Sequence, residues 1–486
     1  MRKNQYVRLV ALLLVALFML TACGTPENNP DVVIADPSAQ GEQPGSEVGG
    51  EGSDVVEDPF ADVDWPVTLS VWTSNTGNGG EFLTSAAAAF NASQSRFIVD
   101  LSYAGSYSEV LAKMAASKAG SRPDMFSADT EGAYTYYENA EIYVPIQKHI
   151  DEDAYNMDGV VQNLRSAYTN LEGEWQCMPL GNTVTGFFYN AELLQKAGVD
   201  PRTDLNSYQE ILAACEKLKS AGVKTPFFMH TSSGFYTFPM TSQGIQYVDN
   251  NNGKDGVPTR SLINEGACRD ATIDFFQFLK DSSSKGLMVP FGTTVADAQS
   301  AFVNGECAIM CSFISSFSTV NNQVNGKFEF GYHEAPTITA GVPNVGQCVG
   351  GGVLFLANNN NPVKEHGAWE FMQFLMKDEN TSAFAQATGY LPTTQGGFET
   401  ADYQAFVESI FPTARYSIEA QQKTPETCYN AWLPMFNDFH ALCKEYYTMA
   451  CNTSTSAEDI TARFAAAVDE VIDLYWMSTG QAKPAA

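Results

Sequence analysis

The sequence predicts an α/β protein with a mostly parallel sheet, and three observations lead to this fold class. Apolar and polar residues alternate at Val67, Leu69 and Val71 and again from Phe97 to Tyr103, which is the period-two pattern of half-buried strands. Helix-start signals follow such segments at several points of the chain. Strands that alternate with amphipathic helices favour parallel sheets covered by helices.

The expected helices have recognisable ends. Ser106-x-x-Glu109 and Ser207-x-x-Glu210 match the capping box, in which a hydroxyl and a carboxylate satisfy the first free backbone amides of a helix. Thr455-x-x-Glu458 predicts a third helix start in the same way. Gly222 is expected to end the helix that starts near Ser207, because glycine readily adopts the left-handed conformation found after helices.

The N-terminus predicts export from the cytoplasm. Arg2, Lys3 and Arg8 precede an apolar run from Leu9 to Leu20, which is shorter than the roughly 20 residues of a membrane span. Residues 1–22 therefore match a signal peptide. The run ends in Leu20-Thr21-Ala22-Cys23, which resembles the lipobox of bacterial lipoproteins and implies a diacylglycerol on Cys23; an ordinary secretory signal with a chance cysteine is the alternative.

Composition identifies a linker and excludes some partners. Residues 23–65 carry the lipobox cysteine and an acidic stretch rich in Gly, Pro and Ser, so they are expected to be a disordered tether or a passive spacer. The whole chain of 486 residues has 27 Lys+Arg against 56 Asp+Glu and a net charge of -29. Such a surface repels nucleic acid and anionic lipid, so we expect neither as a partner.

The cysteines predict no metal site and no disulfide framework. Nine cysteines remain besides Cys23, and an odd number gives no complete set of pairs. None of them lies in a CxxC pair or a Cys/His cluster with metal-ligand spacing. We expect mostly buried small apolar side chains, with no metal and no cofactor.

Several segments, in order along the chain, resemble the family 1 extracellular solute-binding proteins of ABC importers. The C-terminal part is most similar to the glycerol-3-phosphate and sugar binders of that family. The segments that carry the resemblance are Arg122–Met125, Phe188–Leu194, Ala197–Pro201, Ala301–Ala308, Gly350–Gly352, Ala368–Phe371 and Thr388–Pro392.

The resemblance implies a type II periplasmic-binding-protein fold, in which two α/β lobes enclose a ligand cleft. It assigns 66–183 and 312–356 to the N-terminal lobe, and 184–311 and 357–480 to the C-terminal lobe. The three crossings between lobes are then expected near 183–187, 310–314 and 353–357. It also implies a monomer that delivers its ligand to ABC permease subunits and stays extracytoplasmic, anchored to the cell membrane.

The candidate ligand-binding residues follow strands or lie in glycine-rich and aromatic loops. A sugar offers an apolar ring face to aromatic side chains and hydroxyls to Asp, Glu, Asn and backbone amides. Ligands of open α/β sheets sit at the carboxyl ends of strands. The candidates are Trp72, Asn75, Tyr107, Asp129, Glu131, Asn182, Tyr236, Gly350, Gly351, Tyr390 and Trp432.

Each kind of candidate also has a purely structural interpretation. The aromatic residues are also suited to the core, and Gly350 and Gly351 to close packing. Asp129 and Glu131 suit the start of a helix, where carboxylates interact with the helix dipole.

The ligand is expected to be a neutral sugar or oligosaccharide. The glycerol-3-phosphate binders place an arginine in a C-terminal loop, whereas the corresponding segment here, Cys428–Pro434, has no Arg or Lys. Phosphate recognition favours a charge-assisted donor.

Two other function classes stay open. One is a binder of polyamines, metal chelates or another small solute, suggested by Asp129, Glu131 and the acidic composition. The other is a secreted enzyme acting on polysaccharide through paired carboxylates. The chain has no G-x-S-x-G, HExxH or GxxxxGK[ST] motif, so we expect no catalysis.

Overall fold

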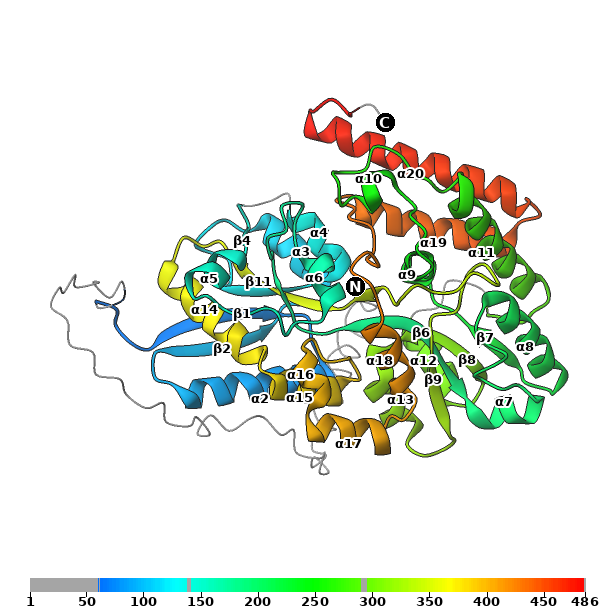
Figure 1. Ribbon diagram of the computed structural model, residues 1–486, viewed down its shortest axis with the longest axis horizontal. Helices are drawn as coiled ribbons and strands as arrows, with labels where there is room; N and C mark the ends of the chain where they lie inside the picture. The colour runs from blue at the N-terminus through cyan, green and yellow to red at the C-terminus, as the bar shows by residue number, and fades with distance from the viewer. Residues whose placement is uncertain (1–59, 61, 138–140, 290–294, 485–486) are drawn as a thin grey trace, which may run out of the picture. The chain divides into compact units, whose positions relative to one another are not determined.

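The computed structural model describes residues 60, 62–137, 141–289 and 295–484 (Figure 1). The predicted signal peptide, Cys23 and nearly all of the predicted linker lie outside these residues. The described residues belong to one compact unit.

The first sheet has the strand order β2-β1-β3-β11-β4, and β5 pairs with β11. Strand β1 is parallel to β2 and β3, whereas β11 is antiparallel to β3, β4 and β5. The predicted strands at 67–71 and 97–103 are confirmed as the neighbours β1 and β2. The strands of this sheet are β1 (Val67–Thr73), β2 (Phe97–Tyr103), β3 (Met125–Asp129), β4 (Tyr143–Val144), β5 (Met178–Pro179) and β11 (Gly352–Ala357).

The second sheet has the order β10-β6-β8-β7, and β9 pairs with β6. Only β7 and β8 are parallel; β8, β9 and β10 are antiparallel to β6 where they pair with it. Among the described residues the sheets are thus mixed, not mostly parallel as the sequence predicts. The strands are β6 (Thr183–Asn190), β7 (Thr225–Phe228), β8 (Cys307–Phe313), β9 (Phe330–Glu334) and β10 (Val349–Gly350).

Helices cover both sheets. Helices α2 and α14 lie beside the first sheet, whereas α11, α19 and α20 pack on one another at the second (Figure 1). The helices before β6 are α2 (Gly77–Ser93), α3 (Tyr107–Ala116), α4 (Thr130–Tyr137), α5 (Gln147–Glu152) and α6 (Gln162–Tyr168). Those between β6 and β9 are α7 (Ala191–Ala197), α8 (Tyr208–Ser220), α9 (Gly234–Ser242), α10 (Asp249–Asn252), α11 (Gly266–Ser284), α12 (Val295–Val303), the short 3₁₀-helix η1 (Ile314–Ser316) and α13 (Phe317–Val324). After β11 follow α14 (Pro362–Leu375), α15 (Asp378–Thr388), α16 (Gln395–Glu399), α17 (Ala401–Ser409), α18 (Ala414–Gln422), α19 (Phe436–Asn452) and α20 (Ala457–Thr479).

Two of the three predicted helix starts are confirmed. Ser106 and Glu109 form a complete capping box at α3, and the Ser207 hydroxyl accepts a hydrogen bond from the Glu210 amide at α8. Gly222 follows α8 with φ +86° and is confirmed as the residue after its end. At α20 the cap is Ser456, one residue later than predicted, and its hydroxyl accepts from the Asp459 amide.

The strand pairing differs from the predicted lobe boundaries. The chain passes from the first sheet to the second between β5 and β6, and back between β10 and β11, close to two of the expected crossings. The expected crossing near 310–314 lies instead inside the second sheet, because β8 continues to Phe313 and β9 then pairs with β6. Only β11 of segment 312–356 joins the first sheet, and α14 packs on β1 and β11.

The structure has two large hydrophobic cores: the first packs on the first sheet and also contains Phe188, Met310 and Tyr332 of the second sheet, and the second packs on the second sheet. Eight of the nine cysteines from Cys177 to Cys451 are buried, so the prediction of mostly buried small side chains is confirmed, with Cys451 only partly buried. No helix of the described residues is long and apolar enough to cross a membrane.

Candidate functional site

A groove lies where the loop after β1 meets η1 and α13. Its volume is about 390 Å³, and it is lined from both sheets. The loop after β1 comes from the first sheet, and Ser315 lies in η1, two residues after the end of β8 of the second sheet. All of the lining residues are uncharged: Asn75, Thr76, Gly77, Asn78, Gly79, Ser315, Ser318, Thr319, Asn322, Gln323, Thr388 and Tyr390.

Hydrogen bonds fix the residues that line the groove on the first-sheet side, which follow β1 and begin α2. The Asn75 backbone amide and side-chain amide both donate to the Thr73 hydroxyl, at 3.0 and 3.2 Å. The Asn78 side chain donates to the carbonyl oxygen of Ala387 at 2.8 Å. The loop after β1 and the end of α15 therefore present a fixed row of amides and hydroxyls.

A small enclosed cavity of about 40 Å³ lies at the ends of β3 and α3. Tyr107, Asp129 and Tyr136 line it from the first-sheet side, and Phe436 and Asn437 line it from the start of α19. The structure thus brings the predicted residues Tyr107 and Asp129 together. It adds Phe436 and Asn437, which the sequence analysis missed.

Tyr390 connects the groove and the cavity. It lines the groove together with Ser315, and its hydroxyl is close enough to the Ser315 and Tyr107 side chains for both to affect its pKa. Burial is the main cause that raises the pKa of Tyr390 and the pKa of Tyr107, so both hydroxyls keep their protons at neutral pH. Protonated phenols offer both a donor and an acceptor to a ligand hydroxyl.

Asp129 is the acidic group of this site. Desolvation raises the pKa of its carboxyl, and the hydrogen bond from the Gly132 amide, at 2.8 Å, partly opposes this shift. This bond lies at the start of α4, so the helix-start interpretation of Asp129 also applies. Glu131 follows within α4, and the placement of its side chain is not described.

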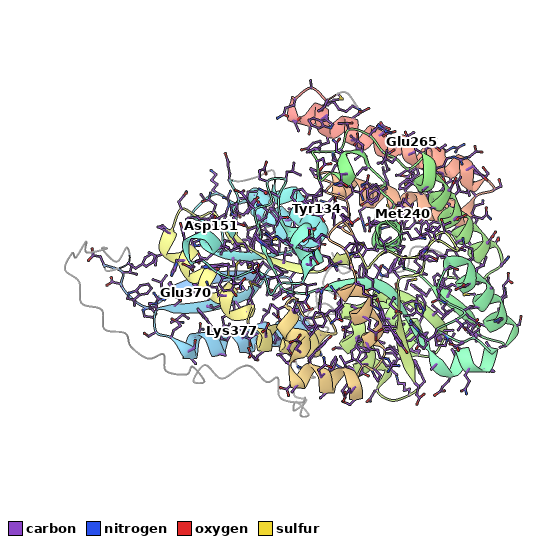
Figure 2. All side chains as sticks on the ribbon, viewed as in Figure 1. Tyr134, Asp151, Met240, Glu265, Glu370 and Lys377 are labelled. Carbon is purple, nitrogen blue, oxygen red and sulfur yellow. The ribbon has the colours of Figure 1, made fainter. Side chains whose placement is uncertain are left out.

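Trp432 lies at a contact between the two sides of the molecule. Its side chain is buried, and its ring centroid lies 5.4 Å from that of Tyr134. Tyr134 belongs to α4 and is labelled in Figure 2. The Lys254 ammonium lies 4.1 Å from the centre of the Trp432 ring and 5.6 Å from that of Tyr429. The segment Cys428–Pro434 has no basic residue of its own, but the fold supplies one from elsewhere in the chain.

Tyr236 is not part of the site. It is fully buried in the second core, its hydroxyl is 2.7 Å from that of Thr272, and its ring packs on Phe275 and Phe464. The sequence placed it in a Ser/Gly-rich loop, whereas Gly234–Ser242 form a buried helix. We correct this assignment.

Three candidates occupy the passages between the sheets. Asn182 is fully buried, and its side chain donates to the Pro392 carbonyl at 3.2 Å. An added Cβ at Gly351, which has φ +141°, would lie 2.0 Å from the Gly181 carbonyl oxygen, and one at Gly350 would lie 2.9 Å from the Phe238 ring. These contacts favour the close-packing interpretation of both glycines.

Trp72 packs against the first core from β1 and is half-buried. Its strand neighbours are Ser102 and Phe126, and it lines neither the groove nor the small cavity. The structure therefore favours the core interpretation of this side chain.

Metal ligation finds no support in the described ranges. No group of three or more His, Cys, Asp or Glu side chains with metal-binding geometry occurs in the part of the chain that the structure describes. The chemistry of the groove is instead that of hydrogen bonding between uncharged groups.

Comparison with known proteins gives one family. The family model for bacterial extracellular solute-binding proteins matches residues 85–411, about two thirds of the chain. The sn-glycerol-3-phosphate-binding periplasmic protein UgpB of Pectobacterium atrosepticum is 29% identical over 351 residues, covering 70% of this chain and 76% of the relative. The UgpB protein of Agrobacterium fabrum is 24% identical over 345 residues, covering 69% of this chain and 76% of the relative.

Solved structures agree on the fold. The cyclic alpha-maltosyl-1,6-maltose binding protein of Arthrobacter globiformis has a TM-score of 0.68 at 18% identity, covering 84% of this chain and all of that one. UgpB of Mycobacterium tuberculosis, in complex with glycerophosphocholine, has a TM-score of 0.70 at 18% identity, covering 84% of this chain and 99% of that one. The predicted two-lobed type II fold is confirmed, and the chain belongs to the family of bacterial extracellular solute-binding proteins.

Proposed function

We propose that the protein captures a carbohydrate, either a neutral sugar or an oligosaccharide, and delivers it to an ABC importer. The groove is the observation that carries this proposal. It contains amide and hydroxyl groups from both sheets and an aromatic ring, that of Tyr390, and no lining residue is charged. Sugars are recognised by this combination of polar groups and aromatic faces.

The site proposed from these contacts combines the groove and the small cavity. Asn75 and Ser315 supply hydrogen bonds from opposite sides, and Tyr390 connects them to Tyr107 and Asp129. A solute that contacts both walls stabilises the closed arrangement of the lobes, which is how two-lobed binding proteins couple capture to closure.

The known ligands of similar proteins support a carbohydrate or a related polyol. The Arthrobacter globiformis protein binds a cyclic maltose derivative, and the UgpB relatives are named for sn-glycerol-3-phosphate. Both ligands carry several hydroxyl or ester oxygens.

The remaining parts of the proposal concern location and partners. The signal peptide and lipobox support a protein anchored outside the cytoplasm through Cys23. We propose that it acts as a monomer, presents its solute to membrane permease subunits and catalyses no reaction. A turnover assay on glycans tests the last point, because sustained product release at enzyme-like rates would contradict it.

A phosphate ester of glycerol is a second candidate, and one contact favours it. The Lys254 ammonium lies beside Tyr429 and Trp432, so the C-terminal loop has a cation next to it. A cation of this kind is what a phosphate would require. Lys254 does not line the groove, which is why we rank the neutral ligand first.

Isothermal titration calorimetry distinguishes the candidates. We expect a member of a panel of maltose, maltotriose and cyclic glucans to bind with a stoichiometry of one, and far more tightly than sn-glycerol-3-phosphate. Ser315→Ala should weaken that binding by about tenfold, since one good hydrogen bond contributes about 1–1.5 kcal/mol. Thr84→Ala, outside the groove, is the control. Tight binding of the phosphate ester with no response to any sugar would overturn the proposal.

A further inference from the structure

Lys254 joins the two sides of the molecule directly. It follows α10 on the second-sheet side, and its ammonium donates a hydrogen bond of 2.9 Å to the carbonyl oxygen of Thr169. Thr169 is the residue that follows α6, and the Tyr168 hydroxyl of this helix lies 3.0 Å from that of Thr130, the first residue of α4 on the first-sheet side. The bond breaks if the two sides move apart at this point.

Aromatic rings enclose the same ammonium. The Trp432 ring lies 4.1 Å away and is itself in contact with Tyr134 of α4, so the lysine and the tryptophan both touch the first-sheet side. Separation of the two sides would expose the ammonium to water. The hydration of Lys254 is therefore linked to the arrangement of the lobes.

An unusual turn fixes Lys254 in this position. Asn250, Asn251 and Asn252 all have left-handed backbones, with φ of 52°, 54° and 53°. Asparagine tolerates this conformation better than most residues, but three in a row are strained. The Asn252 side chain accepts hydrogen bonds from the amides of Tyr247 and Val248, which ties the turn to the second core.

In the part of the chain that the structure describes, no carboxylate forms an ion pair with the Lys254 ammonium, and no neighbouring charge contributes to its pKa shift. The chain as a whole nevertheless has an excess of acidic residues. Desolvation alone lowers the pKa of Lys254 to about 7. In water a lysine has a pKa near 10.4, so the enclosed position disfavours the charged form.

We propose that closure of the two lobes is linked to the release of a proton from Lys254. The proton leaves Nζ for solvent when the lysine enters the contact with Thr169 and Trp432, and it returns when the lobes open. Low pH therefore favours the open arrangement and high pH the closed one. The proposal rests on the proposed function in one respect, that the lobes open and close around a solute.

Other ionisable groups near this contact do not account for the expected effect. Burial raises the pKa of Tyr429 to about 12, so its hydroxyl stays neutral near pH 7. Asp255 is next in the chain, and Asp249 accepts hydrogen bonds from the amide and hydroxyl of Thr259. Arg165 lies one turn before Thr169 on α6. Variants that change Lys254 alone keep all four groups.

Small-angle X-ray scattering of the purified full chain, without any added solute, tests the proposal. Wild-type protein should have a smaller radius of gyration at about pH 8.5 than at about pH 6. With a pKa near 7 closed and about 10.4 open, the ratio of closed to open protein should rise by at most about 30-fold between these pH values.

Two variants provide matched comparisons. Lys254→Met keeps the length of the side chain without charge, so it should be equally compact at both pH values. Lys254→Arg stays charged and should show no compaction with rising pH. Lys254→Gln replaces the methionine variant if that one fails to fold.

A wild-type radius that does not change with pH would overturn the proposal, as would an equal pH response in the neutral variant. Because no solute is present, these results do not depend on whether the ligand is a carbohydrate. Failure of the calorimetric screen and failure of this linkage are thus separate outcomes.

Discussion

Replacing Trp432 with alanine separates the packing role of this residue from its role in ligand binding. Its side chain is only 8% exposed, and its ring contacts Tyr134 and the Lys254 ammonium. An aromatic side chain buries about 150–250 Å², which corresponds to roughly 4–6 kcal/mol at about 25 cal/mol per Å². This area is an upper bound, and measured losses for such truncations are about 3–5 kcal/mol.

We therefore expect Trp432→Ala to lower the free energy of unfolding by about 3–5 kcal/mol, measured by urea denaturation followed by circular dichroism. Trp432→Phe, which keeps a ring next to Tyr134, should lose clearly less. Binding of the best sugar should stay within about twofold of the wild-type affinity, because Trp432 lines neither the groove nor the small cavity.

The two measurements distinguish the possible roles. An unfolding loss below about 1 kcal/mol together with a large loss of affinity would refute the packing interpretation and place the ring in the cleft. A large loss of stability with unchanged affinity would remove Trp432 from the ligand site.

Three further predictions test other parts of the molecule. Cys23→Ala should release the protein from membranes or leave it unprocessed, as shown by fractionation; membrane-bound, normally processed mutant protein would contradict the lipobox assignment. Folding lowers the pKa of Lys254, so above about pH 7 the unfolded state binds more protons than the folded state and a rise in pH stabilises the fold. In urea denaturation, the free energy of unfolding of the wild type should therefore rise relative to that of Lys254→Met by about 1–2 kcal/mol from about pH 7 to 8.5. A difference between the two proteins that does not change with pH would refute this prediction. Gly351→Ala should destabilise the protein by more than about 2 kcal/mol, because the added Cβ would lie 2.0 Å from the Gly181 carbonyl oxygen. An unchanged midpoint of thermal unfolding would contradict this prediction and show that the backbone around Gly351 shifts to accommodate the methyl group.

The family and the helix starts could be predicted because each is indicated by a few residues that are close together in the sequence. The capping boxes at Ser106 and Ser207 depend on residues three apart, and both occur in the structure. The order of the solute-binding segments gave the family, and Asn75, Tyr107, Asp129 and Tyr390 are among the predicted site residues that line the groove or cavity.

Sheet pairing could not be predicted in the same way. The strand β9 joins β6 of the second sheet across more than a hundred residues, although it lies in the segment 312–356 that was predicted to belong to the N-terminal lobe. The Ser- and Gly-rich sequence around Tyr236 predicted a loop near the ligand, whereas Gly234–Ser242 form a helix of which every residue is buried. Burial depends on what packs against a segment, and the segment alone carries little information about its neighbours.

The sequence by itself determined the family, and it predicted a lipoprotein-like N-terminus and the class of groups that we propose hold a solute. Only the tertiary structure decided which of those groups meet. Ser315 reached the groove because β8 ends there, and Lys254 reached Trp432 because a left-handed turn and the C-terminal loop are adjacent in space. The sequence shows directly that the segment Cys428–Pro434 carries no basic residue. The charges near the Trp432 ring, however, depend on residues that are distant in the chain and meet only in the folded protein.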